Sequence, residues 1–206
     1  MEYSPHPDLS TRRDHGQFFT GTPTEALRVL RDISSALAYL HNKNLLHHDI
    51  KPGSILSSPG KPPILVDFGV ASEYKPNSSS SGDGTMFYIP REYLVDERRG
   101  PPSDVFALGV TLLYMLRKIP LPESTESRWN IGAVHVDGPD RKAMLAWLKK
   151  VGGAAAKLST AEHNLESVVR GALAMDPKER LSAQQIVEKV KKLEEASTTG
   201  LDRRGF

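Results

Sequence analysis

The chain has 206 residues, of which 38% are hydrophobic and 25% are charged, a composition typical of one soluble globular domain. Its formal net charge of +2 gives no strong field, and it contains no apolar stretch of about 18 residues, so we expect neither a nucleic-acid nor a membrane partner. The absence of cysteine excludes disulfide frameworks and cysteine zinc sites, and it favours a cytoplasmic or nuclear location.

The first strong helical pattern lies in residues 22–44. Thr22 can cap the helix, Pro23 suits its first turn, and Glu25 can complete a capping box. Apolar residues then recur every three or four positions, which predicts an amphipathic helix that runs to about His41. These residues are Leu27, Leu30, Ile33, Leu37 and Leu40.

The pattern changes between residues 45 and 70 to short apolar runs. Ile55 and Leu56 form one run, and residues 64–66 form another. Pro52 and Gly53 interrupt the chain before the first run, so this part predicts small strands and tight loops.

A second helix is predicted over residues 103–116, capped by Ser103 or Asp104. This segment is apolar on every side, which predicts a buried central helix. The later helices are predicted over 143–151, 165–175 and 182–193, followed by a frayed polar tail over 196–206. Ser182 and Gln185 have the spacing of a capping box.

Five motifs follow one another in a recognisable order. The segment HHDIKPGSIL at 47–56 resembles the protein kinase catalytic loop, and Asp-Phe-Gly at 67–69 resembles the metal-binding motif that follows it 18 positions after the catalytic aspartate. Segments 84–92, 103–110 and 176–182 resemble the end of the kinase activation segment, the central helix and a late motif. The chain therefore resembles the C-terminal lobe of a serine/threonine protein kinase.

This resemblance implies a mainly α fold with small β-hairpins, the protein-kinase-like fold of that lobe. The lobe would span 1–195, with a hinge at 1–9 and an activation segment at 67–92. The late helices would occupy 140–195, and the N-terminal lobe would be absent from these residues.

The family motifs also imply a catalytic role for three residues. Asp49 would orient the substrate hydroxyl and accept its proton, and Lys51 would steady the transferred phosphoryl group. A lysine two positions after the aspartate is the serine/threonine pattern of the family. Thr85 would form hydrogen bonds with Asp49 and Lys51.

The nucleotide side of the site is implied in the same way, with ATP and Mg²⁺ as cofactors. The backbone of Glu2 and Ser4 would meet adenine, Asp8 would meet ribose, and Leu56 would form the adenine floor. Asp67 would bind Mg²⁺, because a hard cation prefers carboxylate oxygen, and Ser54 stands where the family has a second metal-binding residue.

Two further contacts are expected from the resemblance. Asp104 would bond the backbone of the catalytic loop besides capping its own helix. Glu92 and Arg180 would form a buried ion pair that ties the activation segment to the late helices.

The sequence departs from the family in three places. It has no glycine-rich loop of the form G-x-G-x-x-G-x-V, no lysine in a V-A-I-K motif and no glutamate to pair with that lysine. Part of the ATP site is therefore not encoded in these residues. Ser54 replaces an asparagine, which predicts weaker metal binding. His48 replaces the arginine that receives an activation-loop phosphate, so loop phosphorylation should not switch this protein in the usual way.

These features leave three functional hypotheses. The first is a kinase-like protein that is catalytically impaired as an isolated lobe, acting as a pseudokinase or binding module. The second is an active kinase whose N-terminal lobe lies elsewhere or comes from a partner, and the third is a non-catalytic decoy or scaffold for kinase substrates. The expected partners are protein substrates or a partner kinase, and Leu9, Leu56 and Phe68 should form an open apolar face that favours self-association or a covering partner.

Overall fold

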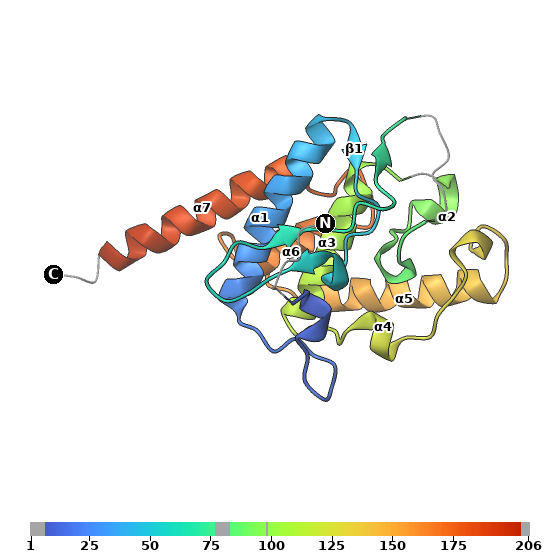
Figure 1. The fold of residues 1–206 in the computed structure, drawn as a ribbon, viewed down its shortest axis with the longest axis horizontal. Coiled ribbons are helices and arrows are strands. Elements are labelled where there is room, and N and C mark those ends of the chain that lie inside the picture. The colour runs from blue at the N-terminus through green and yellow to red at the C-terminus, as the bar shows by residue number, and fades with distance from the viewer. Residues whose placement is uncertain (1–6, 77–82, 98, 203–206) are drawn as a thin grey trace.

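A computed structural model of the chain describes residues 7–76, 83–97 and 99–202. The body of the molecule is built from five longer helices, shown in Figure 1, with short strands and 3₁₀ helices around them. The longer helices are α1 (Pro23–Asn42), α3 (Pro101–Met115), α5 (Pro139–Ala156), α6 (Leu165–Ala172) and α7 (Ala183–Asp202). The predicted mainly α fold is confirmed.

The remaining elements are short and lie before α1 or in the connections between these helices. The 3₁₀ helices are η1 (Leu9–Thr11), η2 (Pro52–Ser54), η3 (Met86–Tyr88) and η4 (Ile131–Ala133), and the short α-helices are α2 (Tyr93–Asp96) and α4 (Pro122–Thr125). The strands are β1 (Leu45–Leu46), β2 (Ile55–Leu56), β3 (Ile64–Leu65) and β4 (Ser72–Glu73).

The strands form two antiparallel pairs. In the β2–β3 hairpin, Ile55 lies opposite Leu65. In the other pair, Leu45 of β1 lies opposite Glu73 of β4, so this ladder joins segments on either side of the catalytic-loop motif. The small β-hairpin predicted around that loop is therefore present, together with a longer-range pair.

Helix α1 begins where the sequence predicts, with one difference. The Thr22 hydroxyl accepts a hydrogen bond from the Glu25 amide at 3.2 Å, as a helix cap should. The predicted capping box is wrong, because the Glu25 side chain turns into the structure, where it accepts hydrogen bonds from Arg12 and from the Ser57 hydroxyl. Glu25 is buried, and a buried carboxylate needs such partners.

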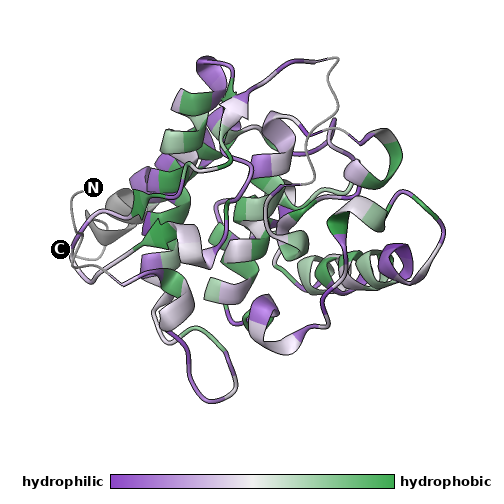
Figure 2. Cartoon of the chain, turned by 45° about the vertical axis from the view of Figure 1, so that its right-hand side comes forward, coloured by the Kyte–Doolittle hydropathy of each residue, from purple (hydrophilic) through white to green (hydrophobic). Residues whose placement is uncertain are grey.

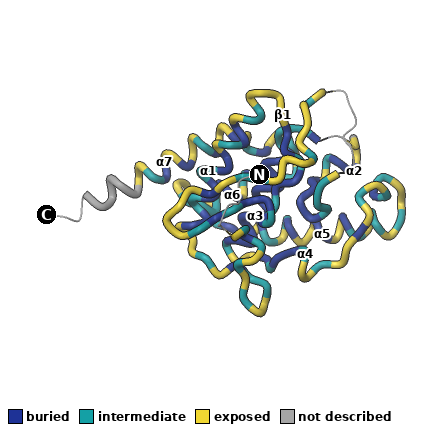
Figure 3. Tube along the Cα trace, viewed as in Figure 1, coloured by how far each residue is buried: buried dark blue, intermediate teal, exposed yellow. Residues whose placement is uncertain are grey.

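Helix α3 is the centre of the core. Every residue from Ser103 to Met115 is buried, which Figure 3 shows as a dark helix enclosed by the others. The helix begins two residues earlier than predicted, at Pro101, and the Ser103 hydroxyl accepts from the Gly100 amide at 3.2 Å. The other long helices carry both hydrophobic and hydrophilic residues (Figure 2), as expected for helices that bury one face.

Helix α7 packs beside α1 and extends away from the body (Figure 1). Its start is as predicted, since the Ser182 and Gln185 side chains each accept from the other residue's amide. Its backbone remains helical to Asp202, so the frayed tail predicted from residue 196 is wrong for residues 196–202.

The apolar face predicted beside the hinge is smaller than expected. Leu9 is fully buried, and the Tyr114 hydroxyl donates to the Leu9 carbonyl at 3.2 Å, so the expectation of an open Leu9 is wrong. Leu56 is partly buried, whereas Phe68 remains 49% exposed and Ile64 46% exposed.

The predicted ion pair between Glu92 and Arg180 is present. Two parallel contacts of 2.6 and 3.0 Å join the guanidinium to both carboxylate oxygens, and the Arg180 side chain is fully buried. Arg180 also donates to the carbonyls of Ala174 and Pro102 and lies 5.0 Å from the centre of the Phe106 ring. One side chain therefore links the activation segment, the start of α3 and the segment before α7.

Replacing Arg180 by alanine should lower the free energy of unfolding by about 3–5 kcal/mol, because the Glu92 carboxylate would keep its partly buried place without a cation. Urea denaturation followed by circular dichroism measures the change. Arg31→Ala is the matched control, because Arg31 pairs with Glu194 at 3.0 Å on an exposed surface and should cost less than about 1 kcal/mol. Equal losses in the two variants would contradict a special role for the buried pair.

Candidate functional site

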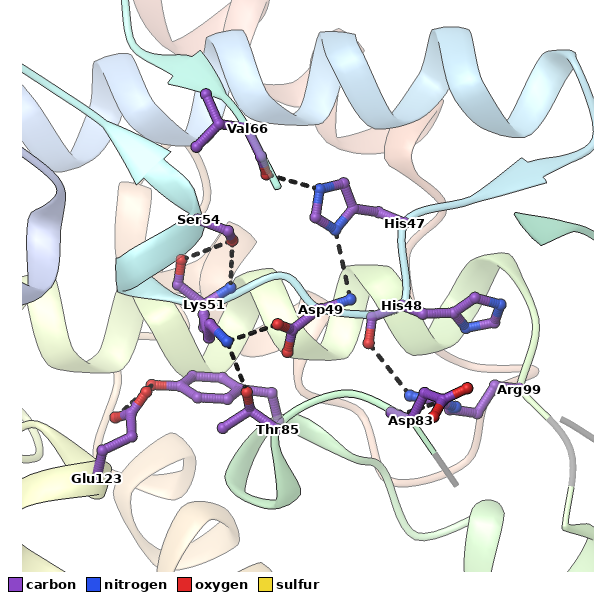
Figure 4. A network of polar contacts seen from close by, with 11 residues as sticks. His47, His48, Asp49, Lys51, Ser54, Val66, Asp83, Thr85, Arg99 and Glu123 are labelled. Atoms are coloured by element: carbon purple, nitrogen blue, oxygen red, sulfur yellow. Dashed lines mark hydrogen bonds and ion pairs between the residues drawn. The ribbon is translucent and has the colours of Figure 1, made fainter. Parts of the chain in front are cut away.

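The catalytic-loop motif, residues 47–56, follows β1 and runs through η2 into β2 (Figure 4). Its backbone is held from α3 by Asp104, whose two carboxylate oxygens accept from the amides of His47 and His48, each at 2.9 Å. Asp104 Oδ2 also lies 3.1 Å from His41 Nε2, at the end of α1. The expected contact between Asp104 and the loop is confirmed, although Asp104 is not the cap of its helix.

The ionisation of Asp104 reflects this arrangement. Burial disfavours the charged carboxylate, but the hydrogen bonds from His41 and from the two loop amides outweigh burial and lower the pKa of Asp104 below its ordinary value. The loop is therefore anchored to an ionised carboxylate inside the protein.

His47 supplies a second anchor, although it is not among the site residues that the sequence predicts. Its Nε2 lies 3.0 Å from the Val66 carbonyl, and its Nδ1 accepts from the Asp49 amide at 3.3 Å. These partners require the proton on Nε2. Its ring also packs edge-on against Phe68, with 4.8 Å between centroids, so His47 joins the catalytic loop to the Asp-Phe-Gly segment.

The three predicted catalytic residues lie together (Figure 4). Lys51 Nζ contacts Asp49 Oδ2 at 2.5 Å and Thr85 Oγ1 at 2.9 Å. The other oxygen of the Asp49 carboxylate, Oδ1, is buried without a hydrogen-bond partner in the described structure. A buried carboxylate oxygen without a partner is costly, so this atom is suited to accept a hydrogen bond from a bound hydroxyl.

Of the four residues predicted to contact the nucleotide, the structure describes two. Glu2 and Ser4 lie outside the described residues. Asp8 caps η1 through Oδ1, which accepts from the Ser10 amide at 2.8 Å and the Thr11 amide at 3.2 Å. Leu56 forms a backbone bridge with Asp8, so these two predicted ligand-binding residues are neighbours.

The two predicted metal-binding residues differ in their surroundings. Asp67 is exposed after β3, in a left-handed backbone conformation with φ of 67°. Ser54 is buried, and its hydroxyl accepts from the Lys51 amide and donates to the Lys51 carbonyl, both at 3.0 Å. Ser54 thus closes the η2 turn, and its role as a metal ligand stays a prediction that this geometry does not favour.

Arg99 holds the activation segment against the catalytic loop, a role that the sequence did not signal because Arg99 stands in a short charged run before α3. It is buried and donates to the His48 carbonyl at 3.2 Å and to the Asp83 carbonyl at 2.5 Å. Gly84 fits this close approach, since its φ is +100° and an added Cβ would lie 2.6 Å from the His48 carbonyl.

His48 itself makes a different contact from the arginine that it replaces. Its Nε2 lies 2.9 Å from the Ser72 hydroxyl of β4. Burial, together with the neighbouring Arg99 cation, lowers the pKa of His48. His48 is therefore a neutral ring at physiological pH and does not present the fixed cation of the family pattern.

Glu123 is a further residue near the site that the sequence did not indicate. The Tyr88 hydroxyl donates to both of its carboxylate oxygens, at 3.1 and 3.0 Å. Burial raises the pKa of Glu123, and burial also raises the pKa of Tyr88, so this pair is a partly desolvated hydrogen-bonded unit below Thr85.

Comparison with known proteins agrees with this geometry. A model of the protein kinase domain matches residues 1–190. The chain is 30% identical over 130 residues to mitogen-activated protein kinase kinase kinase 17 of Arabidopsis thaliana, covering 62% of this chain and 34% of that protein. It is 30% identical over 159 residues to a leucine-rich repeat receptor protein kinase of Oryza sativa, and the match covers 72% of this chain and 11% of that protein.

A third relative is a mitogen-activated protein kinase kinase of Aspergillus fumigatus, 32% identical over 114 residues, which are 52% of this chain and 22% of that protein. The chain thus spans about a third or less of the length of these relatives. Among the described residues, no helix has the length and apolar character needed to cross a membrane.

Substituting Asp104 by asparagine should lower the free energy of unfolding by about 3 kcal/mol at neutral pH, because charge-assisted hydrogen bonds to His41 and the loop amides are lost. The folded-state pKa of Asp104 is depressed, so its contribution is complete above the ordinary pKa of about 4 and is lost as the pH falls through the lower folded-state value. Urea titrations across this pH range should show the difference between the two proteins shrinking as the pH falls below about 4.

The control for this experiment is Asp137→Asn, since the Asp137 side chain is fully exposed and its replacement should leave stability unchanged. A difference between wild type and Asp104→Asn that stays constant with pH would show that the Asp104 charge is not what stabilises the loop.

Proposed function

The chain belongs to the protein kinase family, and we propose that it forms the substrate-side lobe for ATP-dependent phosphoryl transfer to serine or threonine hydroxyls of proteins. The observation that carries this proposal is the state of the Asp49 carboxylate. Lys51 holds one oxygen at 2.5 Å, while the other oxygen is buried and has no partner in the described structure.

This arrangement matches what the reaction needs on the acceptor side. A substrate hydroxyl would donate to Asp49 Oδ1, and its oxygen would form the new bond to phosphorus as the bond from phosphorus to the ADP oxygen breaks. The hydroxyl proton would pass to Asp49. Lys51, itself held by the Thr85 hydroxyl, would fix the carboxylate and place a positive charge beside the transferred phosphoryl group.

In this proposal, Asp67 would bind the Mg²⁺ of Mg-ATP and Leu56 would contact the adenine. Mg²⁺ is commonly held by one or two carboxylates together with phosphate oxygens, and the exposed Asp67 carboxylate fits that donor set, whereas Ser54 does not. Mg²⁺, when bound, would neutralise charge on the ATP phosphates. Leu56, which is partly buried on β2, is suited to contact an adenine ring.

We further propose that these 206 residues transfer phosphate slowly by themselves. They include neither a glycine-rich loop nor its paired lysine, and loss of one preorganised donor typically costs about 10²–10³ in rate. The chain alone would then serve as an impaired kinase or a binding module, with protein substrates as partners. The cytoplasm or nucleus is the expected location.

A second candidate is an active kinase in which another segment or partner supplies the missing groups. The exposed side chains of Ile64 and Phe68 favour it, because Phe68 belongs to the Asp-Phe-Gly segment, Ile64 precedes that segment on β3, and they are 49% and 46% exposed. Large exposed apolar side chains can mark a surface that a partner covers. A decoy that only binds kinase substrates would retain the fold but would not need the Asp49 geometry.

The first test is phosphoryl transfer from radiolabelled ATP to a protein substrate, by the chain alone and mixed with a separate kinase N-terminal lobe. We expect slow transfer alone and faster transfer in the mixture, and Asp49→Asn should lower both by about 10²–10⁴ because the proton acceptor is lost. Asp137→Asn should leave the rates unchanged. Transfer that survives in Asp49→Asn, or no transfer under either condition, would contradict the proposal.

A calorimetric titration with Mg-ATP tests the nucleotide side separately. Binding should be weak, and Asp67→Ala should remove its dependence on Mg²⁺ because the metal-binding carboxylate is gone. Micromolar affinity in the unmodified chain would mean that the residues present suffice to hold ATP. Magnesium dependence that persists in Asp67→Ala would remove Asp67 from the metal site.

A further inference from the structure

A cavity of about 560 Å³ opens directly beside the catalytic cluster. Its lining includes Lys51 and Thr85, together with the charged residues Arg13, Glu123 and Arg128. Ligand-binding pockets in proteins typically have volumes of about 300–1,000 Å³, and this cavity falls within that range. Because Lys51 and Thr85 belong both to this wall and to the cluster around Asp49, whatever fills the cavity lies next to the acceptor hydroxyl.

The charged groups on the cavity wall are not balanced. Lys51 is already paired with Asp49. Glu123 is the one carboxylate among the described residues that line the cavity, and the Tyr88 hydroxyl donates to both of its oxygens. Two arginines therefore remain against this single carboxylate.

Neither of these arginines has an acidic partner. In residues 7–76, 83–97 and 99–202, no carboxylate lies within 4 Å of Arg13 or Arg128, and the Arg13 guanidinium donates to the Ser10 carbonyl. Both are exposed. Two arginines close to them in sequence are paired, Arg12 with Glu25 and Arg117 with Asp14, whereas among the described residues the two that line the cavity are not.

We propose that this cavity selects substrates that carry an acidic side chain close to the phosphorylated serine or threonine. The carboxylate of an aspartate or glutamate would pair with Arg13 and Arg128, because planar guanidinium groups bind carboxylates through two parallel hydrogen bonds. This inference rests on the proposed kinase function, since it assigns the substrate class of the same site. A basic side chain at that position would face two like charges.

Peptide binding tests this without requiring catalysis. Three fluorescent peptides would share one serine and differ only in its neighbours, which are glutamates, alanines or lysines on both sides. Fluorescence anisotropy with the full chain at physiological ionic strength should show the glutamate peptide binding at least about tenfold tighter than the alanine peptide, with the lysine peptide weakest. Equal affinities for the three peptides would overturn the proposal.

Charge reversal then locates the site. The double variant Arg13→Glu, Arg128→Glu should prefer the lysine peptide, and the milder Arg13→Gln, Arg128→Gln should bind the glutamate and alanine peptides equally. The matched control is Lys142→Glu, Lys149→Glu, which changes the net charge equally at exposed positions on α5 away from the cavity. If this control weakens binding of the glutamate peptide as much as the cavity variant does, overall charge rather than the cavity is responsible.

Asp49→Asn separates this inference from the proposed function. It should keep the preference for the glutamate peptide while losing phosphoryl transfer. Preference without transfer in the unmodified chain would overturn the proposed function alone, whereas transfer without preference would overturn the acidic-substrate inference alone.

Discussion

The buried carboxylate of Asp104 is the constraint on which the site depends. Two loop amides and the His41 ring share its two oxygens, so the backbone of His47 and His48 can take one position relative to α3. An unsatisfied charge at that depth would cost several kcal/mol, which makes displacement of the loop unfavourable. The place of Asp49 follows, because it is the next residue along the chain.

Three other contacts extend this anchoring to the activation segment. His47 joins the loop to the Val66 carbonyl and the Phe68 ring, and Arg99 joins it to the Asp83 carbonyl. Arg180, in the segment before α7, forms an ion pair with Glu92 of the activation segment. Each contact spans segments that are distant in sequence, so Asp49, Lys51 and Thr85 are positioned by the core of the fold rather than by their own loops.

The replacements in the catalytic loop have a physical consequence. His48 is a neutral ring directed at the Ser72 hydroxyl, and the buried cation near it is Arg99, which donates to backbone carbonyls. A cation that already binds carbonyls of both segments holds them together without an added phosphate. The Ser54 hydroxyl bonds both backbone groups of Lys51 and closes the η2 turn, so of the two predicted metal ligands only Asp67 has an exposed side chain.

The sequence by itself determined the mainly α fold, the start of α1 and the central place of α3, because periodicity and capping residues are local properties of the chain. Through the resemblance of its motifs to the protein kinase family, it also indicated Asp49, Lys51, Thr85 and Asp67 as candidates and the pair of Glu92 with Arg180. Only the tertiary structure decided the partners of Glu25, the burial of Leu9 and the roles of Arg99 and Glu123. Those depend on contacts between segments far apart in sequence, where burial and charge neutralisation, not local pattern, select the neighbour.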